Sequence, residues 1–126
     1  MTIRVLVADD DPLICTLVAV CLADIAETSQ AGDGEEALGV LEQAAVDLLL
    51  LDWKMPAPDG LAVLKIVRSQ GLRIPVIMIT AESDRSCVLE AIRAGASDYL
   101  IKPFDATALR EKVKKVLQLV DRQAPL

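Results

Sequence analysis

The chain has 126 residues, which suits one ordinary domain, and apolar residues make up 53% of it, enough for one hydrophobic core. Its net charge of −6 argues against nucleic acid or an anionic membrane surface as a direct partner, and no apolar run is long enough for membrane insertion. Three cysteines without zinc-ligand spacing predict free thiols in a cytoplasmic protein that has no signal peptide, and the absence of histidine excludes His-based catalytic triads.

The first part of the chain predicts a strand, a helix and a weaker second strand. Residues 3–8 are an apolar run typical of a buried strand, and Asp11 followed by Pro12 is typical of a helix start. Helical spacing predicts one buried face on this helix, formed by Leu13, Ile14, Leu17, Val18, Cys21, Leu22 and Ile25. Residues 27–30 are the weakest of the predicted strands.

A strand at 48–51 is the clearest element of the middle of the chain. Before it, Asp33 and Glu36 form a capping pair for a helix that runs to about residue 43. Four consecutive leucines then lead into Asp52. Such a run suits a strand covered on both faces or part of a buried helix, and the Pro-Gly-rich segment after it favours the strand. A carboxylate there is rarely without a partner, so we favour a functional Asp52 over a helix cap or turn residue.

Two further helices enclose a fourth strand. A helix over residues 59–71 turns Leu61, Leu64 and Val67 inward, and residues 75–80 form another buried strand. Either Ser83 or Asp84 caps the next helix, which stops at Gly95 and carries the apolar residues Val88, Leu89 and Ile92.

The predicted elements end with a short strand and a helix. Residues 99–101 form the fifth strand, and Asp105 caps a last helix whose apolar stripe is Leu109, Val113, Val116, Leu117 and Val120. We expect one domain over residues 1–121, with a tail or the start of a linker at 122–126.

Strand and helix alternate five times, which predicts an α/β fold with a parallel sheet covered by helices on both faces. Five strands suit a doubly wound (βα)5 three-layer sandwich of the flavodoxin-like type, with strand order 2-1-3-4-5. In such sheets the ligand lies at the carboxyl ends of the strands, beside strands 1 and 3.

Reactive side chains follow four of the five predicted strands: Asp9, Asp10, Asp52, Thr80 and Lys102. Because the carboxyl ends of parallel strands meet at one edge, we expect these residues to lie close together. Three adjacent carboxylates do not all stay ionised without a cation, and a site with oxygen ligands alone suits Mg²⁺ or Mn²⁺. A carboxylate can then act as the nucleophile that forms an acyl phosphate, while Lys102 and Thr80 contact other phosphoryl oxygens.

Each of these residues also has an ordinary interpretation. The acids at 9–11 suit a solvated helix cap, Thr80 a strand-end hydroxyl and Lys102 a surface lysine beside a turn proline. We favour a phosphoryl-transfer site because the reactive types coincide at four strand ends. The sequence has no GxxxxGK[ST] or GxGxxG loop to hold a nucleotide, so a small donor or another protein must supply the phosphoryl group.

The chain resembles the receiver domain of bacterial two-component response regulators over residues 3–119. The motifs are the acidic pair Asp9–Asp10, the stretch DWKMPAPDG that begins at Asp52, Thr80–Ala81 and Lys102–Pro103. Within that family, Trp53, Glu82, the AGAS segment at 94–97 with Tyr99, and Phe104 are most similar to the chemotaxis regulators.

The resemblance implies the metal and phosphoryl ligands. Asp52 is similar to the phosphoacceptor, and Thr80 and Lys102 match the pair that contacts the phosphoryl group. The implied Mg²⁺ ligands are Asp10, Asp52 and the backbone carbonyl of Lys54, with Asp9 acting through water. Lys54 departs from the Asn of the chemotaxis regulators, which leaves a carbonyl ligand in place but can change rates.

The resemblance also implies a switch. Tyr99 matches the aromatic residue that swings inward on activation, and the Lys102–Pro103 bond is expected to be cis. Lys54 and Glu82 are expected to project over the site as an opposite-charge pair that slows loss of the phosphoryl group. The alternative is that Lys54 and Glu82 are two independent, solvated charges.

The implied function is a phosphorylation-activated signalling switch rather than an enzyme, although it assists its own phosphoryl transfer and self-dephosphorylation. The expected donor is a sensor histidine kinase. The expected output surface is the face formed by the fourth helix, the fifth strand and the last helix, which regulates a partner or output domain. We expect a monomer or a weak, phosphorylation-dependent dimer.

Two alternatives remain at this point. A small Mg²⁺-dependent phosphatase of the haloacid-dehalogenase type would use Asp9 and Asp11 as its D-x-D motif, although Asp98 alone would have to supply its late acids. The chain could also be the receiver part of a larger transcription factor, hybrid kinase or output enzyme.

Overall fold

The strands form where apolar runs are long enough to be buried on both faces. The structure, a computed structural model, describes residues 2–81 and 84–118, and the strands in them are β1 (Arg4–Ala8), β2 (Glu27–Ala31), β3 (Leu48–Leu51), β4 (Val76–Thr80) and β5 (Asp98–Ile101). Every residue of β3 and β4 is buried, as their apolar runs Leu48–Leu51 and Val76–Ile79 predict, whereas β2 is polar and mostly exposed. The strands therefore begin and end within one or two residues of their predicted bounds.

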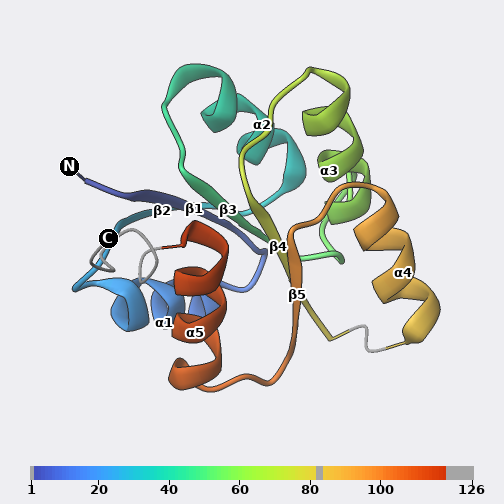
Figure 1. The fold of residues 1–126 in the computed structure, drawn as a ribbon. Coiled ribbons are helices and arrows are strands. Elements are labelled where there is room, and N and C mark those ends of the chain that lie inside the picture. The colour runs from blue at the N-terminus through green and yellow to red at the C-terminus, as the bar shows by residue number, and fades with distance from the viewer. Residues whose placement is uncertain (1, 82–83, 119–126) are drawn as a thin grey trace, which may run out of the picture.

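The helices alternate with the strands along the chain (Figure 1). They are α1 (Pro12–Leu22), α2 (Gly34–Gln43), α3 (Gly60–Ser69), α4 (Arg85–Arg93) and α5 (Ala106–Leu117). Each of these begins after an aspartate whose carboxylate accepts a backbone N–H of the first turn: Asp11, Asp33, Asp59, Asp84 and Asp105. Ser83, the alternative cap for α4, and Val120 lie outside the described residues. No helix in the described part of the chain is long and apolar enough to cross a membrane.

The five strands form one parallel sheet in the order β2-β1-β3-β4-β5, which confirms the predicted doubly wound topology. In the register, Ala8 pairs with Ala31 and Leu51, and Thr80 pairs with Ile101. The last residues of these strands therefore lie along one edge of the sheet, where the helices also begin. This edge is called the carboxyl edge below.

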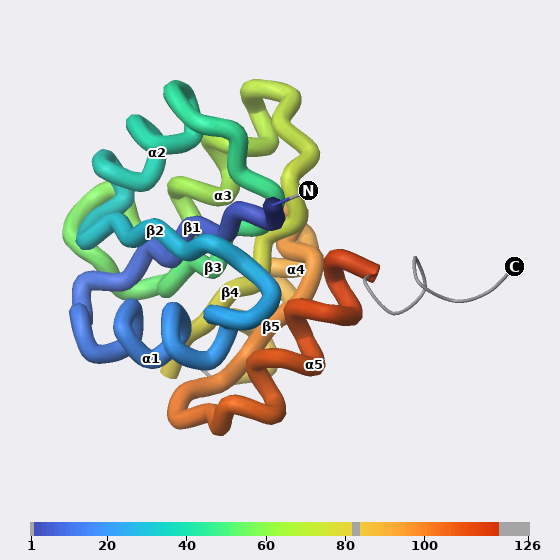
Figure 2. The backbone as a smooth tube through the Cα atoms, turned by 90° about the vertical axis from the view of Figure 1, so that its left-hand side faces the viewer, coloured from blue at the N-terminus to red at the C-terminus, as the bar shows by residue number. Residues whose placement is uncertain are grey.

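Two hydrophobic layers cover the faces of the sheet. Figure 2 shows α2 and α3 on one side of the sheet and α1 and α5 on the other. The first layer packs side chains of α2, α3 and α4, such as Ala37, Val67 and Ala91, against alternate strand residues. The second packs α1 and α5, through Val18 and Leu109, against the remaining strand residues. This is the expected three-layer sandwich.

The predicted buried face of α1 is partly wrong. Cys15, Val18 and Leu22 are buried, but Leu13 and Leu17 are 76% and 39% exposed. The helix also ends at Leu22, three residues before the predicted Ile25. The sequence of α1 is apolar on nearly all sides, so apolar spacing alone does not determine which side faces the sheet.

Candidate functional site

The residues predicted to form a site lie at the carboxyl edge. Asp9 and Asp52 directly follow β1 and β3, Thr80 ends β4, and Lys102 directly follows β5. Carboxylate oxygens of Asp9, Asp10 and Asp52 lie within 4.8 Å of one another. The fold thus brings Asp52 beside Asp9 and Asp10, which precede it by more than forty residues in the sequence.

Lys102 joins two of these carboxylates. Its Nζ donates to Asp9 Oδ2 at 2.7 Å and to Asp52 Oδ2 at 3.2 Å. Its backbone N–H donates to the carbonyl of Thr80 at 2.9 Å, which ties β5 to the end of β4. Burial alone would lower the pKa of Lys102, but the hydrogen bond to Asp9 and the charges of Asp52 and Asp9 outweigh burial and raise that pKa.

Asp9 is buried and its carboxylate is fully engaged. Its Oδ1 accepts the backbone N–H of Asp11 at 2.8 Å, and its Oδ2 accepts Lys102. The thiol of Cys15 contacts the Asp9 backbone carbonyl at 3.6 Å. Asp10, by contrast, is exposed, so it can offer its carboxylate to an ion from solution.

Asp52 is buried beside the carboxylate of Asp9 and the ammonium of Lys102. Burial raises the pKa of its carboxyl, and the charge of Asp9 raises it further, while Lys102 and a backbone hydrogen bond from Lys54 act in the opposite direction. A group in this position is stabilised by any additional cation placed between the carboxylates. Since the cluster offers oxygen ligands alone, it fits a hard divalent ion such as Mg²⁺.

The loop after Asp52 closes back on the site. The N–H of Gly60, the first residue of α3, donates to the Trp53 carbonyl at 2.7 Å. A Cβ on Gly60 would lie only 2.0 Å from the Asp52 carbonyl oxygen, so no residue with a side chain fits there without moving the backbone of Asp52. Sequence reasoning used Gly60 only as a helix start. The sequence signal for the close approach of Gly60 to Asp52 is the Asp59–Gly60 pair that follows the proline-rich loop.

The remaining predicted residues lie beside the cluster. Thr80 is buried, and Tyr99 is 8% exposed within the layer that packs against α4, so its ring is already inside. Lys54 is exposed, and Glu82 lies outside the described residues. The Lys102–Pro103 peptide bond is cis, as is a second bond, Ala57–Pro58, which was not expected.

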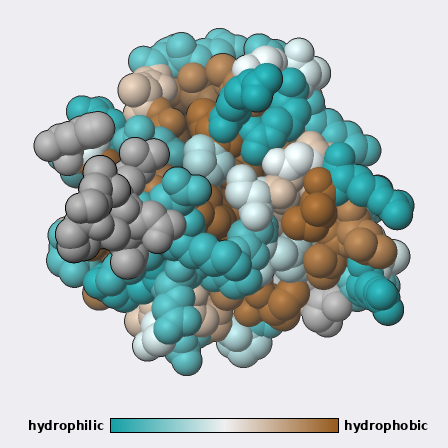
Figure 3. All heavy atoms as spheres, viewed as in Figure 1, coloured by the Kyte–Doolittle hydropathy of each residue, from teal (hydrophilic) through white to brown (hydrophobic). Residues whose placement is uncertain are grey.

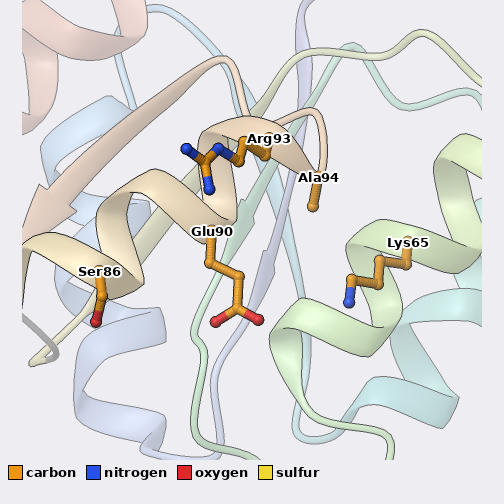
Figure 4. Close-up of a pocket in the computed structure, with 5 residues that line it drawn as sticks. All are labelled: Lys65, Ser86, Glu90, Arg93 and Ala94. Carbon is orange, nitrogen blue, oxygen red and sulfur yellow. The ribbon is translucent and has the colours of Figure 1, made fainter.

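A separate groove of about 430 Å³ lies between α3 and α4 (Figure 4). In Figure 4 the side chains of Lys65 on α3 and Glu90 on α4 extend toward one another across it. None of the residues predicted for the site lines this groove. The groove is therefore separate from the predicted site at the carboxyl edge.

The phosphatase alternative would need Asp9 as its nucleophile and Asp11 as its second acid. The Asp9 carboxylate is buried and hydrogen-bonded on both oxygens, and the Asp11 carboxylate caps α1 by accepting Leu13 N–H at 2.9 Å. Both carboxylates thus accept hydrogen bonds from the chain itself.

Comparison with known proteins gives one consistent family. The model of the response regulator receiver domain matches residues 5–114. The chemotaxis protein CheY of Pseudomonas aeruginosa is 35% identical over 94% of this chain and 98% of its own length. The regulatory protein AtoC of Escherichia coli is 38% identical over 92% of this chain, which corresponds to 25% of AtoC. The solved receiver domain of the Francisella response regulator 1452 has a TM-score of 0.88 and 34% identity, with 94% of this chain and 99% of that chain covered.

These matches do not favour the phosphatase alternative, and they agree with the strand order and with the acidic cluster beside Lys102. The family is known to use a divalent metal, for which the cluster offers ligands. The chain therefore belongs to the response regulator receiver domain family, as a CheY-like, phosphorylation-activated signalling switch.

Proposed function

We propose that the chain accepts one phosphoryl group on Asp52 with Mg²⁺ as its cofactor. An Asp52 oxygen attacks phosphorus, the bond from phosphorus to the donor breaks, and the donor leaves with that electron pair. The bound Mg²⁺ neutralises charge on the carboxylates and on the phosphoryl oxygens. Its proposed ligands are Asp10, Asp52 and the backbone carbonyl of Lys54, with Asp9 acting through water. Mn²⁺ suits the same ligands.

The bridge from Lys102 to Asp9 and Asp52 is the observation that carries this proposal. The bridge holds the ammonium of Lys102 beside the proposed acceptor oxygen. Once Asp52 carries a phosphoryl group, this ammonium can contact a phosphoryl oxygen. Thr80, at the end of the neighbouring strand, would donate its hydroxyl to another phosphoryl oxygen. A hydrogen bond to a charged group nets roughly 1.5–3 kcal/mol, enough to bias a two-state equilibrium by about ten- to a hundredfold.

The proposed switch couples Thr80 to Tyr99 and to the face formed by α4, β5 and α5. Movement of Thr80 towards the phosphoryl group would vacate space for the ring of Tyr99. Because that ring is already buried, the predicted inward swing starts from a largely enclosed side chain and remains a prediction. Leu89 and Ile92 of α4 are 44% and 47% exposed, and apolar atoms gather over α4 in Figure 3, which supports this face as the partner surface.

The proposed setting is the cytoplasm, with a sensor histidine kinase as donor and a partner protein or output domain as receiver of the signal. Receiver domains interact with histidine kinases and output domains, which supports both partners. We further propose the domain bounds 1–121, self-dephosphorylation of Asp52, and a monomer that dimerises weakly when phosphorylated.

The decisive experiment is labelling by acetyl phosphate. Wild-type protein with Mg²⁺ should gain one phosphoryl group on Asp52, measured by intact mass and peptide mapping, and removal of the metal by EDTA should stop the gain. Asp52→Asn should abolish labelling. Asp11→Asn is the matched control, because asparagine caps a helix as well as aspartate, and it should label normally. Undiminished labelling of Asp52→Asn would refute the proposed acceptor.

A further inference from the structure

Gly34, the first residue of α2, lies against the loop that follows Asp52. A Cβ on Gly34 would lie 2.2 Å from the backbone carbonyl oxygen of Pro58, 3.0 Å from its Cγ and 2.8 Å from Cγ2 of Val63. Real Cβ atoms essentially never approach another heavy atom within 3.0 Å. The start of α2 and the loop therefore meet with no room for a side chain.

The loop, residues 53–59, has little freedom to absorb a displacement. Its first residue, Trp53, accepts the N–H of Gly60 at 2.7 Å, so the two ends of the loop are tied together. Met55, in its middle, is 8% exposed and packs in the layer of α2, α3 and α4. Gly60 also contacts the backbone of Asp52 directly. A push on Pro58 is therefore passed to the residues beside Asp52.

The start of α2 is held in place by hydrogen bonds and by burial. Asp33 Oδ1 accepts the N–H of Glu36 at 2.8 Å, and Glu36 Oε1 accepts the N–H of Gly32 at 2.6 Å, which closes a reciprocal cap. One turn on, Ala37 is fully buried against the sheet. A side chain added at residue 34 would therefore press on Pro58 in the loop and on Val63 of α3.

We propose that Gly34 is a positioning residue for the metal site. Its missing side chain fixes the place of Pro58, and through the loop it fixes the Lys54 carbonyl and the Asp52 carboxylate. This inference rests on the proposed function, because it assumes that those two groups hold Mg²⁺. Relief of the Cβ contact would shift the loop by about 1 Å, a displacement large enough to matter for positioned groups.

Gly39 is a matched control within the same helix. A Cβ on Gly39 has nothing within 4 Å, so Gly39→Ala adds the same methyl group to α2 without touching the loop. Alanine also favours the helix over glycine, so this change should stabilise α2. The double variant Gly34→Ala/Gly39→Ala then offsets a loss of stability caused by the first change.

The first test measures Mg²⁺ affinity through the fluorescence of Trp53, the single tryptophan of the chain. We expect the dissociation constant of Gly34→Ala, and of the double variant, to rise by roughly 10- to 100-fold, and that of Gly39→Ala to stay within about twofold of wild type. Urea unfolding of each variant shows that the protein is folded. A folded Gly34→Ala variant with wild-type Mg²⁺ affinity would overturn the proposal.

The second test needs no variant, because a metal ion that is held by the loop should also change the environment of a residue that contacts the loop. In wild-type protein, Mg²⁺ titration followed by amide NMR should move the Gly34 resonance and leave the Gly39 resonance in place. If Gly34→Ala does not fold in either background, this titration decides, and an unmoved Gly34 resonance overturns the proposal. Wild-type protein that binds no Mg²⁺ and is not labelled on Asp52 would instead refute the proposed function.

Discussion

At the scale of single residues, Lys102 and Lys54 share a charge but have different environments. Lys102 is partly buried and bridges Asp9 and Asp52, so two contacts of 2.7 and 3.2 Å fix the position of its ammonium group. Lys54 is exposed on the loop that follows the proposed acceptor. Lys102 is thus suited to contact the phosphoryl group, and Lys54 to control how water approaches it.

Replacement of Lys54 by asparagine should speed loss of the phosphoryl group. The acyl phosphate is lost when water attacks in line with the Asp52 oxygen, and a long side chain over that path excludes or misplaces the water. An exposed ion pair, such as the one predicted between Lys54 and Glu82, contributes only about 0–1 kcal/mol to stability. The effect should therefore appear in the rate of dephosphorylation and leave the free energy of unfolding unchanged. The measurement is the decay of phosphorylated protein for wild type, Lys54→Asn and Glu82→Ala. Equal decay in all three would leave both residues as ordinary surface charges.

At the scale of elements, helix α1 shows how far the spacing of apolar residues predicts which side of a helix is buried. Leu13 is 76% exposed, so Leu13→Gln should change the free energy of unfolding by no more than about 0.5 kcal/mol. Leu22 is fully buried between α1 and the sheet, so Leu22→Ala should cost about 2–5 kcal/mol. Urea unfolding checks both. A large loss of stability in Leu13→Gln would mean that Leu13 is buried, as the apolar spacing of the sequence predicts.

The same elements show why some of the fold and site could be predicted and some could not. The runs at β3 and β4 are uniformly apolar and end in polar residues, so the sequence carries both their type and their ends. The sequence of α1 is apolar on nearly all sides, so it does not indicate which side of the helix faces the sheet. The contacts of Gly34 and Gly60 depend on how close two segments approach in three dimensions, which no local pattern encodes.

At the scale of the whole molecule, aspartates gather at the carboxyl edge. The five aspartate caps lie at the carboxyl edge with the acidic cluster, whereas basic residues occupy the last turns of α3, α4 and α5: Arg68, Arg93, Lys114 and Lys115. Aspartates at helix starts and cations at helix ends also suit the helix dipoles. We expect these aspartates to give the carboxyl edge a negative field that attracts divalent cations.

This field should strengthen Mg²⁺ binding in addition to the effect of the metal ligands themselves. Its contribution to the affinity should fall as the salt concentration rises. The triple variant Asp33→Asn, Asp84→Asn, Asp105→Asn keeps three helix caps and removes three charges. At low ionic strength its Mg²⁺ affinity should be weaker than that of wild type by roughly two- to tenfold. At 1 M salt, where screening acts over about 3 Å, the two proteins should converge. A difference that persisted at high salt would assign the effect to altered structure instead.

The bridge from Lys102 has a consequence for how the chain is made. Asp52 leaves the ribosome 50 residues before Lys102, and Asp9 leaves 93 residues before it. Until β5 has been synthesised, a nascent chain that paired β1 with β3 would hold Asp9 and Asp52 side by side without this ammonium between them. Repulsion between those carboxylates should oppose early closure of the sheet centre, so we expect stable folding to follow the synthesis of β5. The same cluster that binds a cation in the finished protein thereby discourages incomplete chains from settling into a native-like sheet.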